Sequence, residues 1–298
     1  MRHIDAGRFS RYKNTHTYLY FNDAETVMEG IGKTLLAAGH QTNYHEAGQG
    51  DALFLLHGSG PGVSGWTNWA KSMPVFADRW RVIVPDIAGF GFTEFKEDAK
   101  YDIKLWVSHL VGILDALDIP KASFVGNSFG GALAIGLALF APERVNRLVL
   151  LGTPAGEFVQ TAGLRGAWEY EPSLENMERL MQLFPYDKAL ITPELVKSRF
   201  EASARPGAQD ALRRLIPQPA AEGDTLVKGF PAAALAKIAA PTLVVHGRED
   251  RVVPPECGLL IANAVPDADL HLFGRCGHWV QAEQPRRFAA LVRDFLSE

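Results

Sequence analysis

Cysteine is scarce in this chain, with only Cys257 and Cys276 among 298 residues. Two cysteines cannot form a disulfide framework or a multi-cysteine zinc site, and such scarcity is typical of a reducing compartment. Cys276 lies two residues before His278, but a small buried thiol is the simpler interpretation of it. The sequence contains no cluster of metal-ligating residues, so neither a metal ion nor an organic cofactor is expected.

Net charge and long apolar runs are lacking too. The 30 basic and 34 acidic residues leave a formal net charge of −4, which gives no reason to expect nucleic acid or an anionic membrane as a partner. No apolar run reaches the roughly 18 residues of a transmembrane helix, and the N-terminal residues lack the apolar segment of a secretory signal. We therefore expect a cytoplasmic protein.

Short apolar runs alternate with amphipathic helical patterns along the chain. Such runs, each ending in glycine or a polar residue, predict strands that are buried on both faces of a mainly parallel sheet. They lie at residues 52–58, 81–86, 122–126, 147–152, 241–247 and 268–274. Apolar residues at helical spacing also predict a helix that follows Asp102 as its N-cap and ends before Pro120.

The pattern changes between Thr153 and about Phe230. This stretch has no convincing buried strand, and prolines separate its helix-like segments, which lie at residues 173–184, 192–204 and 207–216. Strand-like runs resume only at Pro241, and the sheet needs these later strands. The sequence therefore predicts one α/β core, formed by residues 1–152 and 233–298, with a helical cap of residues 153–232 inserted between its halves.

One short motif places a serine between a predicted strand and a predicted helix. Gly126-Asn127-Ser128-Phe129-Gly130 fits the pattern G-x-S-x-G, in which the serine occupies a sharp, strained turn. The glycines allow the strand and the helix to pass closely, and the helix N-terminus presents free N–H groups to a developing negative charge. The same five residues can also be a glycine-rich packing turn, so the interpretation depends on partners elsewhere in the chain.

Two residues further along can activate this serine. A serine hydroxyl becomes a good nucleophile when a histidine accepts its proton and a carboxylate orients that histidine. Asp250 and His278 each follow the end of a predicted strand, in the order serine, acid, histidine that this fold type uses. Asp250 could instead be one charge of a solvated loop, and His246 is excluded as the base because it precedes the acid. We predict a triad of Ser128, Asp250 and His278.

The glycine-rich stretch at residues 57–69 predicts the rest of an oxyanion hole. Glycines such as Gly58 and Gly60 let a backbone N–H, that of Ser59, turn toward the site, while the N–H of Phe129 follows the nucleophile. The stretch does not fit a phosphate-binding loop, because no lysine follows the glycines.

Five ordered blocks of the sequence resemble the meta-cleavage product hydrolases, a family of α/β-hydrolases. The blocks are HGSGPGVSGWTNW, PDIAGFGFTE, GNSFGG, GREDRVVP and CGHWVQAEQP, and the likeness spans about residues 42–296. The resemblance implies a substrate from aromatic ring degradation, a 2-hydroxy-6-oxohexa-2,4-dienoate. It also implies hydrolysis of the C5–C6 bond without a cofactor, which yields 2-hydroxypenta-2,4-dienoate and a carboxylic acid.

The same resemblance implies which residues bind the substrate. A cap arginine is expected to bind the carboxylate with two aligned donors, and a pair of asparagines to donate or accept at the keto-enol end. The resemblance also implies a pocket tryptophan next to His278. Three of these residues have a structural alternative: Arg199 as an exposed helix charge, Asn68 as a helix cap and Trp279 as part of the core. The residues concerned are Gly58, Gly60, Asn68, Asn127, Arg199 and Trp279.

Two other functions fit the same triad. A carboxylesterase would differ only in the polarity of its pocket, and a ligand receptor of this fold would retain a slow triad. The substituent on C6 also stays open, since apolar residues such as Leu164, Trp168, Met181 and Phe184 either line its subsite or pack the cap. Similarity to the family further implies a homodimer or a larger homo-oligomer.

Overall fold

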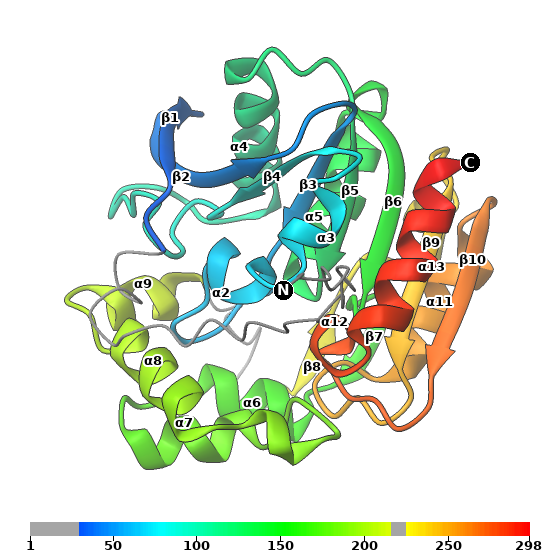
Figure 1. Cartoon of the computed structure of the whole chain (residues 1–298). Helices are drawn as coiled ribbons and strands as arrows, with labels where there is room; N and C mark the ends of the chain where they lie inside the picture. Colours follow the sequence, from blue (N-terminus) through cyan, green and yellow to red (C-terminus); the bar gives the residue numbers. More distant parts are fainter. Residues whose placement is uncertain (1–29, 216–224) are drawn as a thin grey trace, which may run out of the picture.

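The structure, a computed structural model, describes residues 30–215 and 225–298. An eight-stranded sheet runs through it in the order β1-β2-β4-β3-β5-β6-β9-β10 (Figure 1). Strand β2 is antiparallel to both of its neighbours, and all the other pairings are parallel. The strands are β1 (Lys33–Ala37), β2 (His40–Ala47), β3 (Ala52–Leu56), β4 (Arg81–Pro85), β5 (Ala122–Asn127), β6 (Val145–Leu151), β9 (Thr242–Gly247) and β10 (Ala268–Phe273). The mainly parallel sheet predicted from the sequence is confirmed.

The six predicted apolar runs form the six parallel strands. Successive residues of β3 alternate between two apolar clusters, Leu53 and Leu55 facing one layer of helices and Phe54 and Leu56 facing the other. This two-sided burial explains why the strand is apolar throughout rather than alternating with polar residues. Because the strands are parallel and in register, their carboxyl ends meet at one edge of the sheet.

The antiparallel pair β1 and β2 was not predicted. Strand β1 is largely exposed, and Leu36 within it is 61% exposed, so its apolar residues do not mark a buried face. A turn at Ala38 and Gly39, both with positive φ, joins it to β2. The pair therefore extends the edge of the sheet, and it contributes Ala37 and Tyr44 to the apolar cluster on one face.

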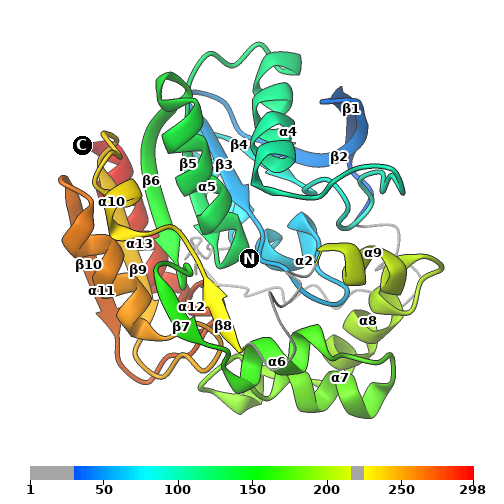
Figure 2. The ribbon, with the colours of Figure 1, turned by 180° about the vertical axis from the view of Figure 1, so that it is seen from behind.

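Two layers of helices cover the sheet (Figures 1 and 2). One face packs against α4 (Ile103–Ala116), α5 (Phe129–Phe140), α10 (Ala232–Leu235) and α11 (Pro255–Ala264), and the other against α2 (Gly65–Trp69), α3 (Met73–Phe76), α12 (Val280–Glu283) and α13 (Pro285–Ser297). A short 3₁₀ turn, η1 (Pro142–Arg144), follows α5. Helix α4 begins where predicted, because Asp102 accepts hydrogen bonds from the N–H groups of Lys104 and Leu105 at 3.0 and 3.1 Å.

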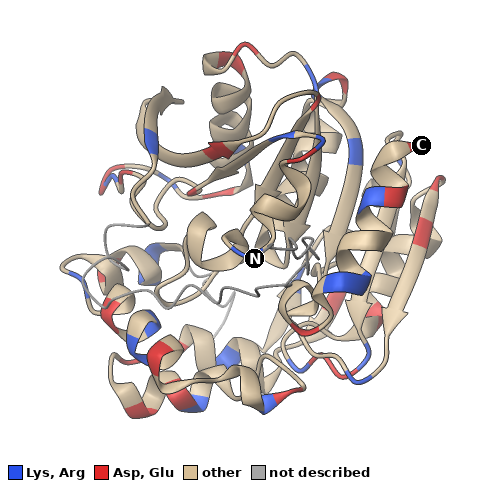
Figure 3. Cartoon of the chain, viewed as in Figure 1, with Lys and Arg blue, Asp and Glu red and all other residues tan. Residues whose placement is uncertain are grey.

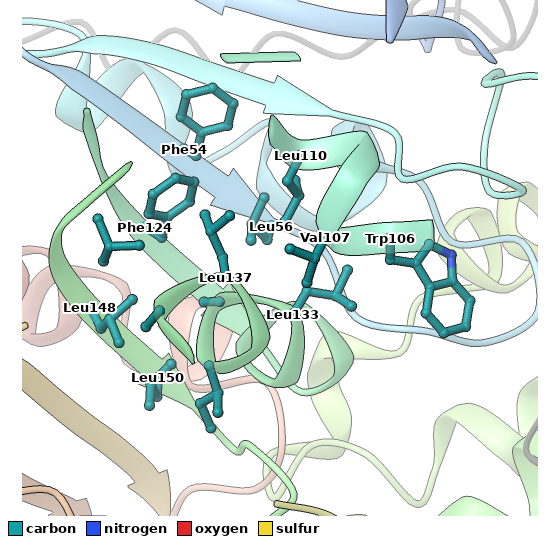
Figure 4. Packing of buried hydrophobic residues seen from close by; sticks show 14 of the residues in the cluster. Phe54, Leu56, Trp106, Val107, Leu110, Phe124, Leu133, Leu137, Leu148 and Leu150 are labelled. Atoms are coloured by element: carbon teal, nitrogen blue, oxygen red, sulfur yellow. The ribbon is translucent and has the colours of Figure 1, made fainter. Parts of the chain in front are cut away.

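Close packing makes the sheet a rigid support for the loops at its edge. Figure 4 shows Phe54, Phe124 and Leu148 from neighbouring strands in contact with side chains of α4 and α5. Each fully buried side chain of this size contributes about 1.5–3 kcal/mol. Gly130 lets α5 lie directly on the strands, since a Cβ there would overlap with the carbonyl group of Leu56.

A separate helical layer lies between β6 and β9 in the chain and along the carboxyl edge of the sheet (Figure 1). It contains α6 (Ala162–Trp168), α7 (Leu174–Met181), η2 (Lys188–Leu190), α8 (Pro193–Ser203) and α9 (Ala208–Leu215), with a two-stranded ribbon of β7 (Glu157–Val159) and β8 (Leu226–Lys228) at its base. Three of the helices correspond to the predicted helical segments, and α6 was not anticipated. The layer has its own apolar cluster, which includes Met177, Leu180 and Val196.

Charged residues of both signs are interspersed on the outer helices of this layer, as Figure 3 shows for α7 and α8. Several form exposed pairs within a helix, such as Arg179 with Glu175 at 3.8 Å, which contribute little to stability. In the part of the chain that the structure describes, no helix has the length and apolar character needed to cross a membrane.

Candidate active site

Ser128 occupies the turn between β5 and α5. Its φ of 54° and ψ of −115° are a strained combination for a residue with a side chain. The turn is held by hydrogen bonds from the Ser128 N–H to the carbonyl of Leu151 at 2.7 Å and from the Ala132 N–H to the carbonyl of Ser128 at 3.1 Å. A Cβ on Gly126 would overlap with the backbone of Gly130, so the close passage inferred from the motif does require glycine. The serine thus stands at the carboxyl edge of the sheet and at a helix N-terminus.

Asp250 and His278 form a buried pair on the loops after β9 and β10. Nδ1 of His278 donates to Oδ2 of Asp250 at 2.7 Å, and Oδ1 accepts from the N–H groups of Val252 and Val253 at 2.8 and 3.0 Å. Burial by itself raises the pKa of Asp250, but the charge of His278 and the hydrogen bonds from two imidazoles outweigh it and hold the pKa below its ordinary value. The ionised carboxylate orients His278 and leaves its Nε2 available as a base.

His246 is a second imidazole on the same carboxylate. Its Nε2 lies 3.3 Å from Oδ2 of Asp250 and 3.0 Å from the carbonyl oxygen of Val253. Both neighbours are acceptors, so Nε2 carries the proton, while Nδ1 is buried against Gly258 without a partner in the described residues. The position of His246 before the acid in the chain excludes it as the base, but nothing in the sequence indicates this supporting contact.

Ser128 and His278 share the wall of a narrow pocket between the sheet edge and the helical layer. The pocket has a volume of about 30 Å³. Its wall is completed by Ser59, Gly60, Phe90, Leu164, Ala167, Trp168, Phe184, Leu212, Leu215 and Val252. Ser128 and His278 therefore face a small space, and most of the other residues in its wall are apolar.

The sequence left open which apolar residues of the helical layer line the pocket and which only pack the layer, and the structure separates the two groups. Leu164, Trp168 and Phe184 line it, whereas Met181 is buried in the core of the helical layer. Phe90 comes from a loop after β4 and was missed, because nothing in its local pattern indicates which way a loop side chain points.

The glycine-rich loop after β3 brings Ser59 and Gly60 to this pocket. His57 fixes the backbone of the loop: its Nδ1 donates to the carbonyl of Gly58 at 2.6 Å, and its Nε2 accepts from the N–H of Ile87 at 2.9 Å. Burial lowers the pKa of His57 to about 4, so the ring is neutral at pH 7 and keeps this tautomer. The loop is therefore held in one conformation before any ligand binds.

The two predicted asparagines lie beside the serine. Oδ1 of Asn68, on α2, accepts from the N–H of Gly58 at 2.9 Å. A Cβ on Gly58 would lie 3.3 Å from Oδ1 of Asn127 and 3.5 Å from Cβ of Ser128, so these residues are immediate neighbours. Phe129 is the first residue of α5, and its N–H consequently has no acceptor within the helix.

Arg199 extends from α8 toward α2. Its Nη1 donates to Oγ1 of Thr67 at a long 3.4 Å, and its Nε is buried without a partner among the described residues. No carboxylate among residues 30–215 and 225–298 forms an ion pair with it. Burial lowers the pKa of Arg199 to about 10, so the guanidinium is still charged at pH 7. A buried cation with unused donors is costly unless an anion binds it.

Trp279 lies next to His278 but is not part of the pocket wall. Its ring packs on Phe184 with centroids 5.4 Å apart and joins the apolar cluster of the helical layer. Of the two roles considered for this tryptophan, packing describes its contacts in the free protein.

The residues available for chemistry are thus the serine, the acid, the histidine and backbone donors. Within the described ranges, no group of three or more His, Cys, Asp or Glu side chains is arranged to hold a metal ion. Cys257 and Cys276 are free and buried, and burial raises the pKa of both thiols.

Comparison with known proteins gives the family. Residues 51–285 match the family of α/β hydrolase fold proteins. The chain is 47% identical to the 2-hydroxymuconate semialdehyde hydrolase of Pseudomonas sp. strain CF600, over 90% of this chain and 94% of that protein. It is 46% identical to the 2-hydroxy-6-oxo-2,4-heptadienoate hydrolase of Pseudomonas putida strain F1, over 90% of this chain and 96% of that protein.

Solved structures agree with this. The meta-cleavage product hydrolase of Pseudomonas fluorescens IP01 superposes with a TM-score of 0.85 at 46% identity, covering 90% of this chain and 98% of the other. The 2-hydroxy-6-oxo-6-phenylhexa-2,4-dienoate hydrolase of Rhodococcus sp. strain RHA1 gives a TM-score of 0.81 at 29% identity, covering 89% and 99%. The chain therefore belongs to the meta-cleavage product hydrolases, carbon–carbon bond hydrolases of the α/β-hydrolase fold.

Proposed function

We propose that this hydrolase uses Ser128, Asp250 and His278 as a catalytic triad on a 2-hydroxy-6-oxohexa-2,4-dienoate with a small group on C6. The observation that carries the proposal is the pocket, which has the serine and the histidine on one wall and little room for an acyl substituent. The hydrogen-bonded pair of Asp250 and His278 supports the assignment of acid and base.

The polar end of the substrate binds on the side of α2 and α8. Within residues 30–215 and 225–298, Arg199 has unused donors in a fixed fork, which match a carboxylate. Asn68 and Asn127, with Gly58 and Gly60, hold the keto-enol end beside the serine. The dienol is first protonated at C5, with His278 carrying the proton, because the resulting ketone gives the later leaving group an electron sink.

Cleavage follows at C6. Ser128 attacks the C6 carbonyl, or assists water in doing so, while His278 takes the proton, and the N–H groups of Ser59 and Phe129 hold the oxyanion. Collapse breaks the C5–C6 bond, and the electron pair leaves as a stabilised dienolate. Water provides the oxygen of the released carboxylic acid, and 2-hydroxypenta-2,4-dienoate is the second product.

The size of the pocket favours hydrogen or methyl on C6. A volume of 30 Å³ accommodates about two water-sized groups, whereas benzene enters cavities of about 150 Å³. Trp168 and Phe184 supply the largest side chains of the wall. Two relatives above 45% identity are named for a semialdehyde and a heptadienoate, and the relative named for a phenyl substrate is 29% identical.

The test is the loss of visible absorbance from dienoates that carry hydrogen, methyl or phenyl on C6, with p-nitrophenyl acetate beside them. We expect the smaller two to be cleaved with at least about a tenfold higher kcat/KM than the phenyl compound. Ser128→Ala should bind and ketonise the dienoate but accumulate uncleaved ketone, and undiminished turnover in that variant would remove the serine from the mechanism. Ester turnover without dienoate cleavage would favour a carboxylesterase, and tight binding without turnover a receptor.

Three further expectations accompany this proposal. Residues 153–232 act as a cap over the site, the protein is a homodimer or larger homo-oligomer, and it works in the cytoplasm on a small-molecule intermediate of aromatic degradation. Light scattering on a size-exclusion column measures the oligomeric state directly, and a monomeric mass at assay concentration would contradict the second expectation.

A further inference from the structure

We propose that Glu283 is a positioning residue that joins the loop carrying His278 to residues 184–187 of the helical layer. This connection fixes the position of His278 relative to the wall of the acyl pocket. The inference rests on the proposed function, because it takes the narrow pocket as the subsite for the C6 substituent. The observations are the contacts of one carboxylate with two distant segments.

Glu283 is the last residue of α12 and is half-buried. Its Oε1 accepts from the N–H of Gly277 at 2.8 Å. Its Oε2 accepts from the N–H groups of Tyr186 and Asp187 at 2.7 and 3.2 Å. One carboxylate therefore satisfies three backbone donors on two segments that lie more than 85 residues apart in the chain, and hydrogen bonds to an ionised acceptor are stronger than neutral ones.

The two segments also touch backbone to backbone. The N–H of His278 donates to the carbonyl of Phe184 at 2.8 Å. A Cβ on Gly277 would overlap with that same carbonyl oxygen and would lie 2.7 Å from the nitrogen of Tyr186. Because there is no room for a side chain at Gly277, the backbones of the two segments pack directly against each other, and Glu283 stabilises this close contact.

Phe184 is the reason why this joint matters for function. Its ring meets that of His278 edge to face, with centroids 5.7 Å apart, and it lines the pocket together with Ser128. A shift of residues 184–187 would consequently move a wall of the pocket and a contact of the base at the same time.

Glu249, on the loop after β9, offers a matched control because it bonds to the same loop that carries His278. Its Oε2 accepts from the N–H of Cys276 at 3.0 Å, and its other oxygen pairs with Arg248 at 2.9 Å. None of these contacts involves the helical layer. Removing Glu249 therefore loosens the loop that carries the histidine, whereas removing Glu283 loosens that loop and its connection to residues 184–187.

Hydrogen exchange tests the joint without any substrate. We expect Glu283→Ala to speed exchange at Gly277, Tyr186 and Asp187 together by about tenfold or more, and Glu249→Ala to speed it at Cys276 without affecting residues 184–187. Unchanged exchange at residues 184–187 in Glu283→Ala would overturn the inference. Glu283→Gln serves as a second variant if the alanine protein does not fold. Glutamine keeps the shape of the side chain, but its amide N–H groups face either the N–H of Gly277 or those of Tyr186 and Asp187, so one of these contacts is lost.

Acyl selectivity tests the consequence. The ratio of kcat/KM for methyl over phenyl dienoate should fall about fivefold or more in Glu283→Ala and stay within about twofold of wild type in Glu249→Ala. In a Phe184→Ala background, loss of Glu283 should change the ratio no further, as expected for two residues that act through one element. An unaltered ratio in Glu283→Ala, or an equal change in Glu249→Ala, would refute the coupling. Wild-type protein that cleaves no dienoate would instead refute the proposed function, and the exchange result would still decide the joint.

Discussion

Replacing Arg199 with methionine should make the free protein more stable and remove most of its activity. The side chain is partly buried, its Nε has no partner in the described part of the chain, and its single described hydrogen bond, to Thr67, is 3.4 Å long. Methionine keeps the apolar length of the side chain and removes the charge. The two effects have opposite signs because the charge is a cost in the empty site and an attraction once a carboxylate binds.

The magnitudes follow from the burial. Burial lowers the pKa of Arg199 from 12.5 to about 10, which at 1.36 kcal/mol per tenfold change is on the order of 3 kcal/mol. Loss of the bond to Thr67 offsets about 1 kcal/mol, so a net gain of about 2 kcal/mol should raise Tm by about 4 °C in a chain of this size. Loss of two charge-assisted bonds to substrate should lower kcat/KM on dienoates about 100-fold to 1,000-fold.

Thermal unfolding and dienoate bleaching measure the two effects, and p-nitrophenyl acetate separates the carboxylate role from damage to the triad. Lys197→Met is the control, since Lys197 lies on the same helix and is exposed, with only a 3.9 Å pair to Glu201. It should change stability by less than about 0.5 kcal/mol and leave both activities unchanged. A less stable Arg199→Met protein with full dienoate turnover would refute the reasoning, and equal losses on ester and dienoate would refute the carboxylate role.

Two further predictions concern buried groups behind the site. If His246 supports Asp250, His246→Gln, which keeps an N–H donor, should stay within about threefold of wild-type kcat/KM, while His246→Leu should fall about tenfold; equal values for the two variants would exclude that support. Burial raises the pKa of Asp86 to about 6 from 3.8, so its charge costs stability above pH 6, and this cost is relieved as the pH falls toward 4. Urea unfolding measures the free energy of unfolding of wild type and of Asp86→Asn at pH 7.5 and 4.5. The value for wild type minus that for the variant should be about 2 kcal/mol larger at pH 4.5. The same difference at both pH values would contradict a raised pKa for Asp86.

The sequence alone was enough to predict that Ser128, Asp250 and His278 lie together at one edge of the sheet. Each of Ser128, Asp250 and His278 follows a strand of a parallel sheet, and parallel strands bring their carboxyl ends to one edge. Chain order and strand periodicity are therefore sufficient to predict that they meet. The N-cap Asp102 was predictable for the same kind of reason, because its bonds go to residues two and three positions away.

Contacts between distant segments could not be predicted in this way. The acceptor that Arg199 finds in Thr67 is 132 residues away, and the donors to Glu283 lie up to 97 residues away. Such pairs depend on how the helical layer is seated on the sheet, and local propensity contains no information about that. The β1–β2 pair was missed for a different reason: the apolar residues of β1 are largely exposed, and most of the buried residues of β2 are polar, among them His40, Thr42 and Asn43.

Contacts between the helical layer and the loops of the site make substrate selection and catalysis interdependent. Oγ1 of Thr161 donates to the carbonyl of Val252 beside the acid at 2.7 Å, and the N–H of His278 donates to Phe184 at 2.8 Å. A Cβ on Gly62, in the oxyanion loop, would overlap with the backbone of α8. The loops after β3, β9 and β10, which carry Gly62, Asp250 and His278, thus each touch the helical layer. A substitution that widens the pocket from the helical side should therefore also disturb the geometry of the base, which is why selectivity and turnover are expected to change together.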